Sequence, residues 1–173
     1  MERKYLNNNG ITLVALVITI IVLLIIASIV VYTGTTTIKN ANLQSLKTNM
    51  LLIEAKAREY VENANYELGI STAEPTNEMK ENSASKLVGE KIDNTDPLVS
   101  KLNIDSKYAV YKLSETDLNN MGIRDVKSND DDGWYIVAYD VSGIEVKVYN
   151  TEGITLSDGS TKYCLDDIRD VNE

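Results

Sequence analysis

The side chains most able to hold a ligand are concentrated in one acidic run, Asn129-Asp130-Asp131-Asp132-Gly133. A calcium loop needs several oxygen ligands that converge around a glycine turn. Ser128, Asp130 and Asp132 have the spacing with which such a loop can begin, but the position where a glutamate would close it is Tyr139. Asp130 and Asp132 therefore remain candidate metal ligands, and a solvated turn before the next strand is the favoured interpretation. We expect no bound cofactor.

Few residue types are available for catalysis. The chain has no histidine and a single cysteine, Cys164. Ser–His and Cys–His catalysis and histidine-based zinc sites are therefore excluded, and no intramolecular disulfide can form. Cys164 lies in the alternating segment Thr161–Leu165, where we expect a small buried hydrophobic residue rather than a reactive thiol. The Asp/Glu pairs outside the acidic run have no basic, metal or nucleophilic partner at a spacing that indicates a catalytic site, so we expect that the protein is not an enzyme.

Tyrosine supplies nearly all of the aromatic side chains, with ten tyrosines, one tryptophan and no phenylalanine. In the strand expected over Trp134–Asp140, residues Tyr135, Val137 and Tyr139 share one face, and the residues between them share the other. One set must pack inward, and the other would form a partner surface. The sequence leaves open which set is outside.

The chain is acidic, with 17 basic and 26 acidic residues and a net charge of −9. This balance argues against a nucleic-acid groove and against docking on anionic lipid headgroups. We therefore expect no nucleic-acid partner.

The longest uniform feature is an apolar run over residues 11–31, which contains no charged residue, proline or glycine. Its only polar residues are Thr12, Thr19 and Ser28. A helix that rises about 1.5 Å per residue needs about 20 apolar residues to cross the hydrocarbon core of a bilayer. The run is long enough, so the sequence predicts a transmembrane segment over residues 11–32 that contacts lipid through residues 11–31.

A ten-residue leader, MERKYLNNNG, precedes the apolar run. Because Lys and Arg near a membrane segment tend to stay in the cytoplasm, Arg3 and Lys4 predict a cytoplasmic N-terminus and an extracellular C-terminal domain. The apolar run is longer than the core of an ordinary cleaved secretory signal, and no clear small-x-small cleavage site follows Ser28. The plain interpretation is an uncleaved single-pass anchor.

The leader supports a more specific interpretation. Gly10, Ile11, Thr12, Leu13, Val14 and Ala15 follow a short basic leader and open the apolar helix. This segment resembles the N-terminal processing site of type IV prepilins and of type II secretion pseudopilins. The resemblance covers roughly residues 1–35. It implies that a prepilin peptidase cuts between Gly10 and Ile11 on the cytoplasmic side, that the new amine of Ile11 is methylated, and that the apolar helix is retained.

One position departs from that family, which usually has a glutamate at the fifth residue of the mature chain. Here that residue is Ala15. A charged group at the bilayer centre costs at least about 2.5–3.5 kcal/mol on insertion scales, so a carboxylate there is kept for a purpose. In the family the glutamate is thought to pair with the N-terminal amine of a neighbouring subunit. Ala15 fits a minor, initiating or tip subunit, or a subfamily that sets its register in another way, for example with the Thr12 hydroxyl.

An amphipathic pattern follows the apolar run. Apolar residues recur at alternating spacings of three and four, which is the stripe of a helix that covers a core; they are Leu43, Leu46, Met50, Ile53, Ala57, Tyr60 and Ala64. Glu54 and Arg58 form an i,i+4 pair on another face. We predict one helix over Ile11–Ala64, with a transmembrane half and an amphipathic half over residues 33–64.

Residues 65–97 are rich in polar residues and contain Pro75 and Pro97. They predict a connecting loop region with a short helix around Asn77–Leu87. The resemblance to pilins implies that this loop varies widely and is a candidate contact surface.

The last part of the chain, residues 98–173, predicts an antiparallel sheet domain. Strands are expected over Lys107–Leu113, Trp134–Asp140 and Ile144–Asn150, with a hairpin turn at Val141-Ser142-Gly143. A capping box at Ser114–Asp117 predicts a two-turn helix. Further turns at residues 150–153 and 157–160 bracket Ile154–Leu156 and lead into Thr161–Leu165. About four strands result, with one face buried and one wet.

Together these patterns predict an α+β fold, in which a long N-terminal helix packs on a C-terminal antiparallel sheet of about four strands. The resemblance implies the same pilin-like architecture. It also implies a structural subunit that partners a prepilin peptidase, other pilin or pseudopilin subunits and an assembly platform, within or at the tip of a type IV pilus or type II secretion-like filament. The alternative is an uncleaved, membrane-anchored extracellular domain for adhesion or sensing. The single cysteine suits a cell without an oxidising export compartment, such as a Gram-positive bacterium.

Overall fold

The structure is a computed structural model that describes residues 9–69, 74–128 and 133–171. Within helix α1 (Asn9–Leu68), the side chains of residues 9–14 and 29–37 lie outside the described set. The chain divides into two compact units, residues 1–42 and residues 43–173. The first unit consists, in its described part, of the N-terminal portion of α1. No helix among the described residues is both long enough and apolar enough to qualify as a membrane span.

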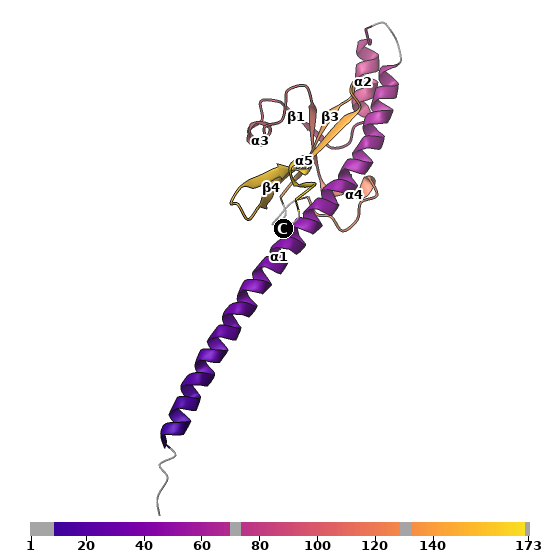
Figure 1. Cartoon of the computed structure of the whole chain (residues 1–173). Coiled ribbons are helices and arrows are strands. Elements are labelled where there is room, and N and C mark those ends of the chain that lie inside the picture. The colour runs from indigo at the N-terminus through magenta and orange to yellow at the C-terminus, as the bar shows by residue number, and fades with distance from the viewer. Residues whose placement is uncertain (1–8, 70–73, 129–132, 172–173) are drawn as a thin grey trace, which may run out of the picture. The chain divides into compact units, whose positions relative to one another are not determined.

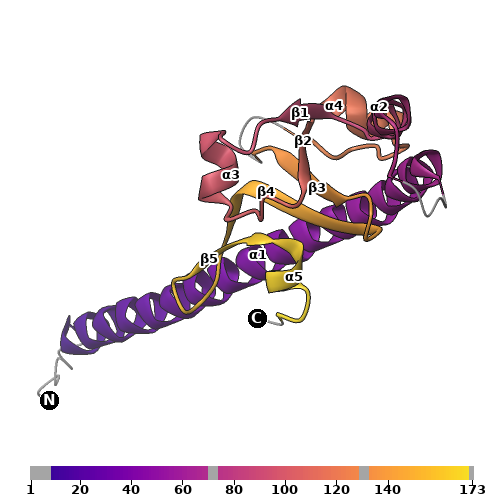
Figure 2. The same cartoon turned by 90° about the horizontal axis from the view of Figure 1, so that it is seen from above.

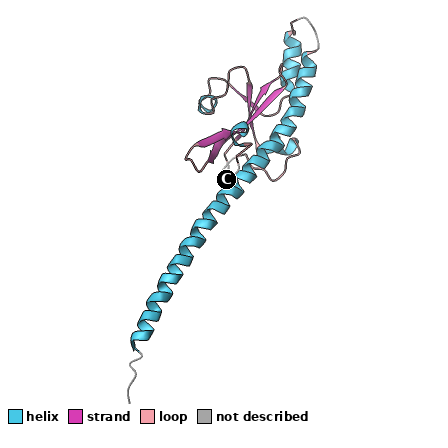
Figure 3. Cartoon of the chain, viewed as in Figure 1, coloured by secondary structure: helices cyan, strands magenta, loops and turns pink. Residues whose placement is uncertain are grey.

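The second unit is an α+β domain built on a single antiparallel sheet (Figure 1, Figure 3). Its strands pair in sequence order: β1 (Glu90–Ile92), β2 (Ala109–Leu113), β3 (Tyr135–Asp140), β4 (Glu145–Thr155) and β5 (Thr161–Cys164). Each connection links neighbouring strands, so the sheet is a meander. The prediction of about four strands missed β1, whose three residues are too few to show an alternating pattern.

Residues 43–68 of α1 cover one face of this sheet (Figure 2). The predicted amphipathic stripe is confirmed: Leu43, Met50, Ile53, Ala57 and Ala64 are buried, and the stripe's other two members are half-buried against the same core. From the sheet, Tyr111, Leu113, Val137, Tyr139 and Val148 complete this core. Burial of such side chains is worth about 1.5–3 kcal/mol each before the entropy cost is counted, so this layer is the main source of the domain's stability.

The sequence predicted that the opposite face of the sheet is exposed to solvent, and this prediction is wrong. A second apolar cluster packs on that face. Ile136, Ala138 and Tyr149 of the sheet pack there against residues 99–104 and Tyr108. These residues come from α3 (Pro97–Lys101) and the segment that follows it, which lies across that face (Figure 2). The strand β3 is therefore buried on both sides, and neither aromatic set of Trp134–Asp140 forms an open row.

Side-chain caps and a glycine mark the ends of the short helices α2 and α4. In α2 (Asn77–Ser85), within the predicted connecting loop, the Thr76 hydroxyl accepts a hydrogen bond from the Met79 amide. The predicted capping box of α4 (Glu115–Asn120) is confirmed, because Ser114 and Asp117 accept each other's backbone N–H groups. Gly122, at a positive φ of 78°, follows the end of α4.

Two predicted features of β4 are wrong. The turn expected at residues 150–153 does not form, because β4 continues to Thr155 through an irregularity in its pairing with β5 between Tyr149 and Ile154. The Asn150 side chain accepts hydrogen bonds from the backbone of Glu152 and Gly153, which satisfies the bulged segment without ending the strand. Ile144, expected to be the first residue of this strand, is instead in the turn before β4 and is 41% exposed.

The C-terminal helix α5 (Leu165–Ile168) is fastened to α1. Leu165 and Ile168 are buried in the main core. An Arg169 guanidinium nitrogen lies 2.8 Å from a carboxylate oxygen of Glu54, which also pairs with Arg58 at 3.2 Å. The Lys47 ammonium donates to the carbonyl of Val171 at 3.2 Å. Packing and ion pairs thus hold the end of this chain, in which Cys164 is the only cysteine.

Candidate assembly segment and surface pocket

The predicted cleavage site lies in the first turn of α1. Within the described residues α1 starts at Asn9, so the bond between Gly10 and Ile11 lies in its first described turn. The motif residues Thr12, Leu13 and Val14 continue the helix, and their side chains lie outside the described residues. Ala15, the first motif residue with a described side chain, is exposed.

About the next four turns of α1 expose an apolar surface. Every residue from Ala15 to Ser28 is exposed, and the large side chains between Leu16 and Ile26 expose 46–65% of their surface. The two polar side chains in this stretch form hydrogen bonds within the helix itself. The Thr19 hydroxyl donates to the Leu16 carbonyl, and the Ser28 hydroxyl donates to the Ile25 carbonyl. The segment therefore offers no free polar group to a partner and can be covered only by apolar surface.

The candidate metal ligands cannot be assigned a geometry. Asp130 and Asp132 lie in residues 129–132, outside the described residues. Within the part of the chain that the structure describes, no three His, Cys, Asp or Glu side chains are grouped so that they could hold a metal ion.

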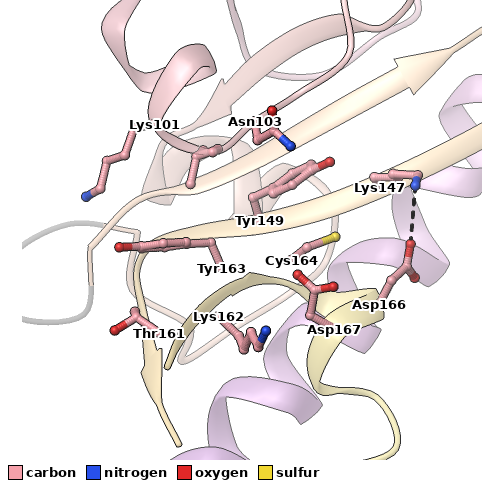
Figure 4. Close-up of a pocket in the computed structure, with 11 residues that line it drawn as sticks. Lys101, Asn103, Lys147, Tyr149, Thr161, Lys162, Tyr163, Cys164, Asp166 and Asp167 are labelled. Carbon is pink, nitrogen blue, oxygen red and sulfur yellow. Dashed lines mark ion pairs between the residues drawn. The ribbon is translucent and has the colours of Figure 1, made fainter. Parts of the chain in front are cut away.

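A polar pocket of about 330 Å³ lies on the sheet domain, between the end of α3, strands β4 and β5, and the start of α5 (Figure 4). Three lysines, Lys101, Lys147 and Lys162, and two aspartates, Asp166 and Asp167, contribute to its lining. Their charges nearly balance, so the pocket does not select strongly for a charged ligand.

Neighbouring groups already hold two of the pocket's lysines. Lys147 forms an ion pair with Asp166 at 3.6 Å (Figure 4). The Lys101 ammonium donates to the Thr151 carbonyl at 2.8 Å and lies 5.3 Å from the centre of the Tyr163 ring. The same ring lies close to Gly153, where an added Cβ would be 2.7 Å from a ring carbon. The ring therefore contacts both the Lys101 ammonium and the backbone of β4.

The pocket's thiol is not activated. Cys164 is half-buried, and burial raises its pKa above the ordinary value for a thiol. A thiolate is the reactive form of cysteine, so a raised pKa keeps the thiol protonated and unreactive at neutral pH. Burial likewise raises the pKa of the Tyr149 hydroxyl beside it. The arrangement can hold a small polar molecule, but it presents no activated nucleophile.

Sequence reasoning did not find this pocket. The local pattern points to Cys164, but Lys101 and Asn103 line the pocket only because α3 folds back over the sheet, and no local pattern predicts that contact. The one available signal was the segment Asp96-Pro97, an N-cap residue followed by a proline, which marks the start of α3.

No protein-family model, no curated protein and no solved structure matches this chain. The function must therefore be argued from the chain's own residues.

Proposed function

We propose that the protein is a pilin-like or pseudopilin-like structural subunit. In this proposal a prepilin peptidase cleaves the chain after Gly10, Ile11 becomes the first residue and is methylated, and the apolar helix is kept. The subunit then leaves the membrane and enters, or caps, a type IV pilus or a type II secretion-like filament.

The observation that carries this proposal is the apolar surface of α1. From Leu16 to Ile26 it is exposed around the whole helix, and its few polar groups are satisfied internally. A helix that is apolar on all sides must be covered by lipid or by other helices. The leader ending in Gly10 lies directly before it, and the 21-residue run 11–31 matches the thickness of a bilayer.

The same surface suits both environments. Lipid tails are about as apolar as leucine, so moving such a helix from lipid into a bundle of similar helices changes little apolar burial. Packing then decides between the two states. The sheet domain is folded on the amphipathic part of α1 and would be carried along by that helix.

A second candidate function is an uncleaved, membrane-anchored binding domain. The polar pocket beside Cys164 supports it, since such a pocket could hold a small ligand outside the cell. The two proposals differ in what happens at Gly10.

Co-expression of the full chain with a prepilin peptidase, followed by N-terminal sequencing and mass spectrometry, tests the proposal. We expect Ile11 as the first residue, carrying the mass of one added methyl group. Gly10→Val should block the cut, because a β-branched side chain replaces the hydrogen atom at the cleaved residue, whereas Asn7→Val should leave it unchanged. An intact Met1 in the parent chain would support the anchored binding domain instead.

A further inference from the structure

The C-terminal segment, residues 165–171, forms one wall of the polar pocket beside Cys164. Its helix α5 follows Cys164 directly and contributes Asp166 and Asp167 to the pocket lining (Figure 4). Burial raises the pKa of the Cys164 thiol, and a hydrogen bond from the Asp166 backbone opposes this shift. The position of the segment therefore decides how far the pocket and the thiol are covered.

The segment has little intrinsic tendency to stay in this position. Helix α5 has four residues, and among the described residues no side chain caps its N-terminus. A helix of that length is not stable by itself in water, so its place depends on contacts with the rest of the domain. The segment also carries three carboxylates, those of Asp166, Asp167 and Asp170, against one cation, Arg169. Because the whole chain has a net charge of −9, long-range repulsion pushes the segment away from the domain.

Ion pairs on two flanks oppose this repulsion. Towards α1, an Arg169 guanidinium nitrogen lies 2.8 Å from a carboxylate oxygen of Glu54, whose side chain is 14% exposed. Towards the sheet, the Asp166 carboxylate lies 3.6 Å from the Lys147 ammonium of β4. Arg169 and Asp166 are themselves 3.5 Å apart, so the segment links the helix to the sheet through its own ion pair.

These contacts are the middle of a longer chain of alternating charges. Its members, in order, are Arg58, Glu54, Arg169, Asp166, Lys147, Glu145 and Lys107. Isolated surface ion pairs contribute little to stability, whereas several charges in one network can contribute measurably. Removal of Arg169 would divide this network into a part on α1 and a part on the sheet.

Apolar packing keeps the closed position dominant. Leu165 and Ile168 are buried in the main core, and Val171 packs partly against it. Strand β5 ends at Cys164, so the strand pairings of the sheet lie outside the segment and would survive its departure. Folded proteins commonly open locally in such units, at a lower cost than global unfolding.

We propose that residues 165–171 form a charge-held latch, which opens as a unit while the sheet stays folded and thereby uncovers the polar pocket and Cys164. The ion pairs of Arg169 and Asp166 set how often the latch opens, and the packing of Leu165 and Ile168 returns it to the closed position. The latch does not depend on whether the chain is cleaved after Gly10.

Alkylation of Cys164 in the full chain in detergent measures the opening, because the chain has no other thiol. Arg169→Gln should raise the rate of reaction with iodoacetamide by about tenfold, the effect of losing a hydrogen bond between charged groups. Arg58→Gln is the matched control. It removes an equal charge from beside the same Glu54 but leaves the pair with Arg169 in place, so the rate should stay nearly unchanged.

Salt and urea separate this local opening from unfolding of the domain. Sodium chloride at about 1 M shortens the Debye length to about 3 Å, so it should raise the alkylation rate of the parent chain and have less effect on Arg169→Gln. Low concentrations of urea should hardly change either rate, since local opening exposes little surface, whereas a reaction that needs global unfolding accelerates steeply with urea. Equal rates for the parent chain and Arg169→Gln, no effect of salt on the parent chain, or a steep dependence on urea would each overturn the latch, and none of these results bears on cleavage after Gly10.

Discussion

At the residue scale, burial of hydroxyl and thiol groups is the clearest electrostatic feature of the sheet domain. Tyr139 and Tyr149 are almost fully buried, and burial raises the pKa of both hydroxyls above the ordinary value of about 10. The pKa of the Cys164 thiol is raised for the same reason. In the folded domain these groups therefore resist losing their protons.

This burial predicts a loss of stability in alkali. Because the folded pKa of Tyr149 exceeds the unfolded value, its contribution to stability is fully present below about pH 10 and is lost as the pH rises through the folded pKa. One such group makes the free energy of unfolding fall by up to about 1.4 kcal/mol per pH unit. Tyr149→Phe should reduce this slope, as measured by urea unfolding of the full chain in detergent across that range.

The matched control for that measurement is Tyr66→Phe. Tyr66 is 77% exposed, so this substitution removes a surface hydroxyl and controls for the loss of one tyrosine outside the core. Equal slopes for the parent chain and for Tyr149→Phe would show that this hydroxyl does not resist ionisation in the folded domain.

At the scale of single elements, the sequence predicted what local patterns encode and missed what distant contacts decide. The stripe from Leu43 to Ala64, the capping box at Ser114 and the helix at Asn77 were predicted because periodicity and caps are local signals. The turn expected at residues 150–153 was wrong, since pairing of β4 with both neighbours overrides the turn propensity of Asn150 and Gly153. Strand β1 and the packing of α3 were missed for the same reason: both depend on partners far along the chain.

The close packing at the irregular part of β4 leads to a prediction about stability. Gly153 has a φ of +69°, and a Cβ there would lie 2.6 Å from the Lys162 carbonyl oxygen and 2.7 Å from the Tyr163 ring. Gly153→Ala should therefore lower the free energy of unfolding by about 2–4 kcal/mol, since it adds overpacking to backbone strain. Denaturant unfolding measures this loss, and the polar pocket beside Tyr163 should be distorted along with it.

Gly159 is the control for the bulge. It also has a positive φ, of +82°, but a Cβ there would meet no atom within 4 Å. Gly159→Ala should cost only the backbone strain, about 1 kcal/mol. If the two alanine variants were equally stable, the close approach of β5 to Gly153 would play no part in holding the sheet together.

At the scale of the whole molecule, the two units differ in how they treat their apolar side chains. The sheet domain buries its apolar residues on both faces of the sheet, whereas the N-terminal part of α1 leaves its apolar side chains exposed. The sequence alone predicted the apolar run and the amphipathic stripe of α1, because both are read directly from residue order. It did not predict the second buried face of the sheet, since that depends on how α3 and the segment after it fold back over the strands.

The exposed segment predicts how the whole chain partitions. Each arginine near the centre of a membrane-spanning helix costs about 2.5–3.5 kcal/mol on insertion scales, so the pair Ile21→Arg and Leu24→Arg should cost about 5–7 kcal/mol. Detergent phase separation of the full chain should then move much of it from the detergent phase to the aqueous phase. Ile38→Arg with Ala41→Arg is the control, because both residues are exposed, have the same spacing and lie beyond the apolar run. If both pairs shift the chain equally, the partition reflects added charge alone, and residues 11–31 do not anchor the protein in lipid.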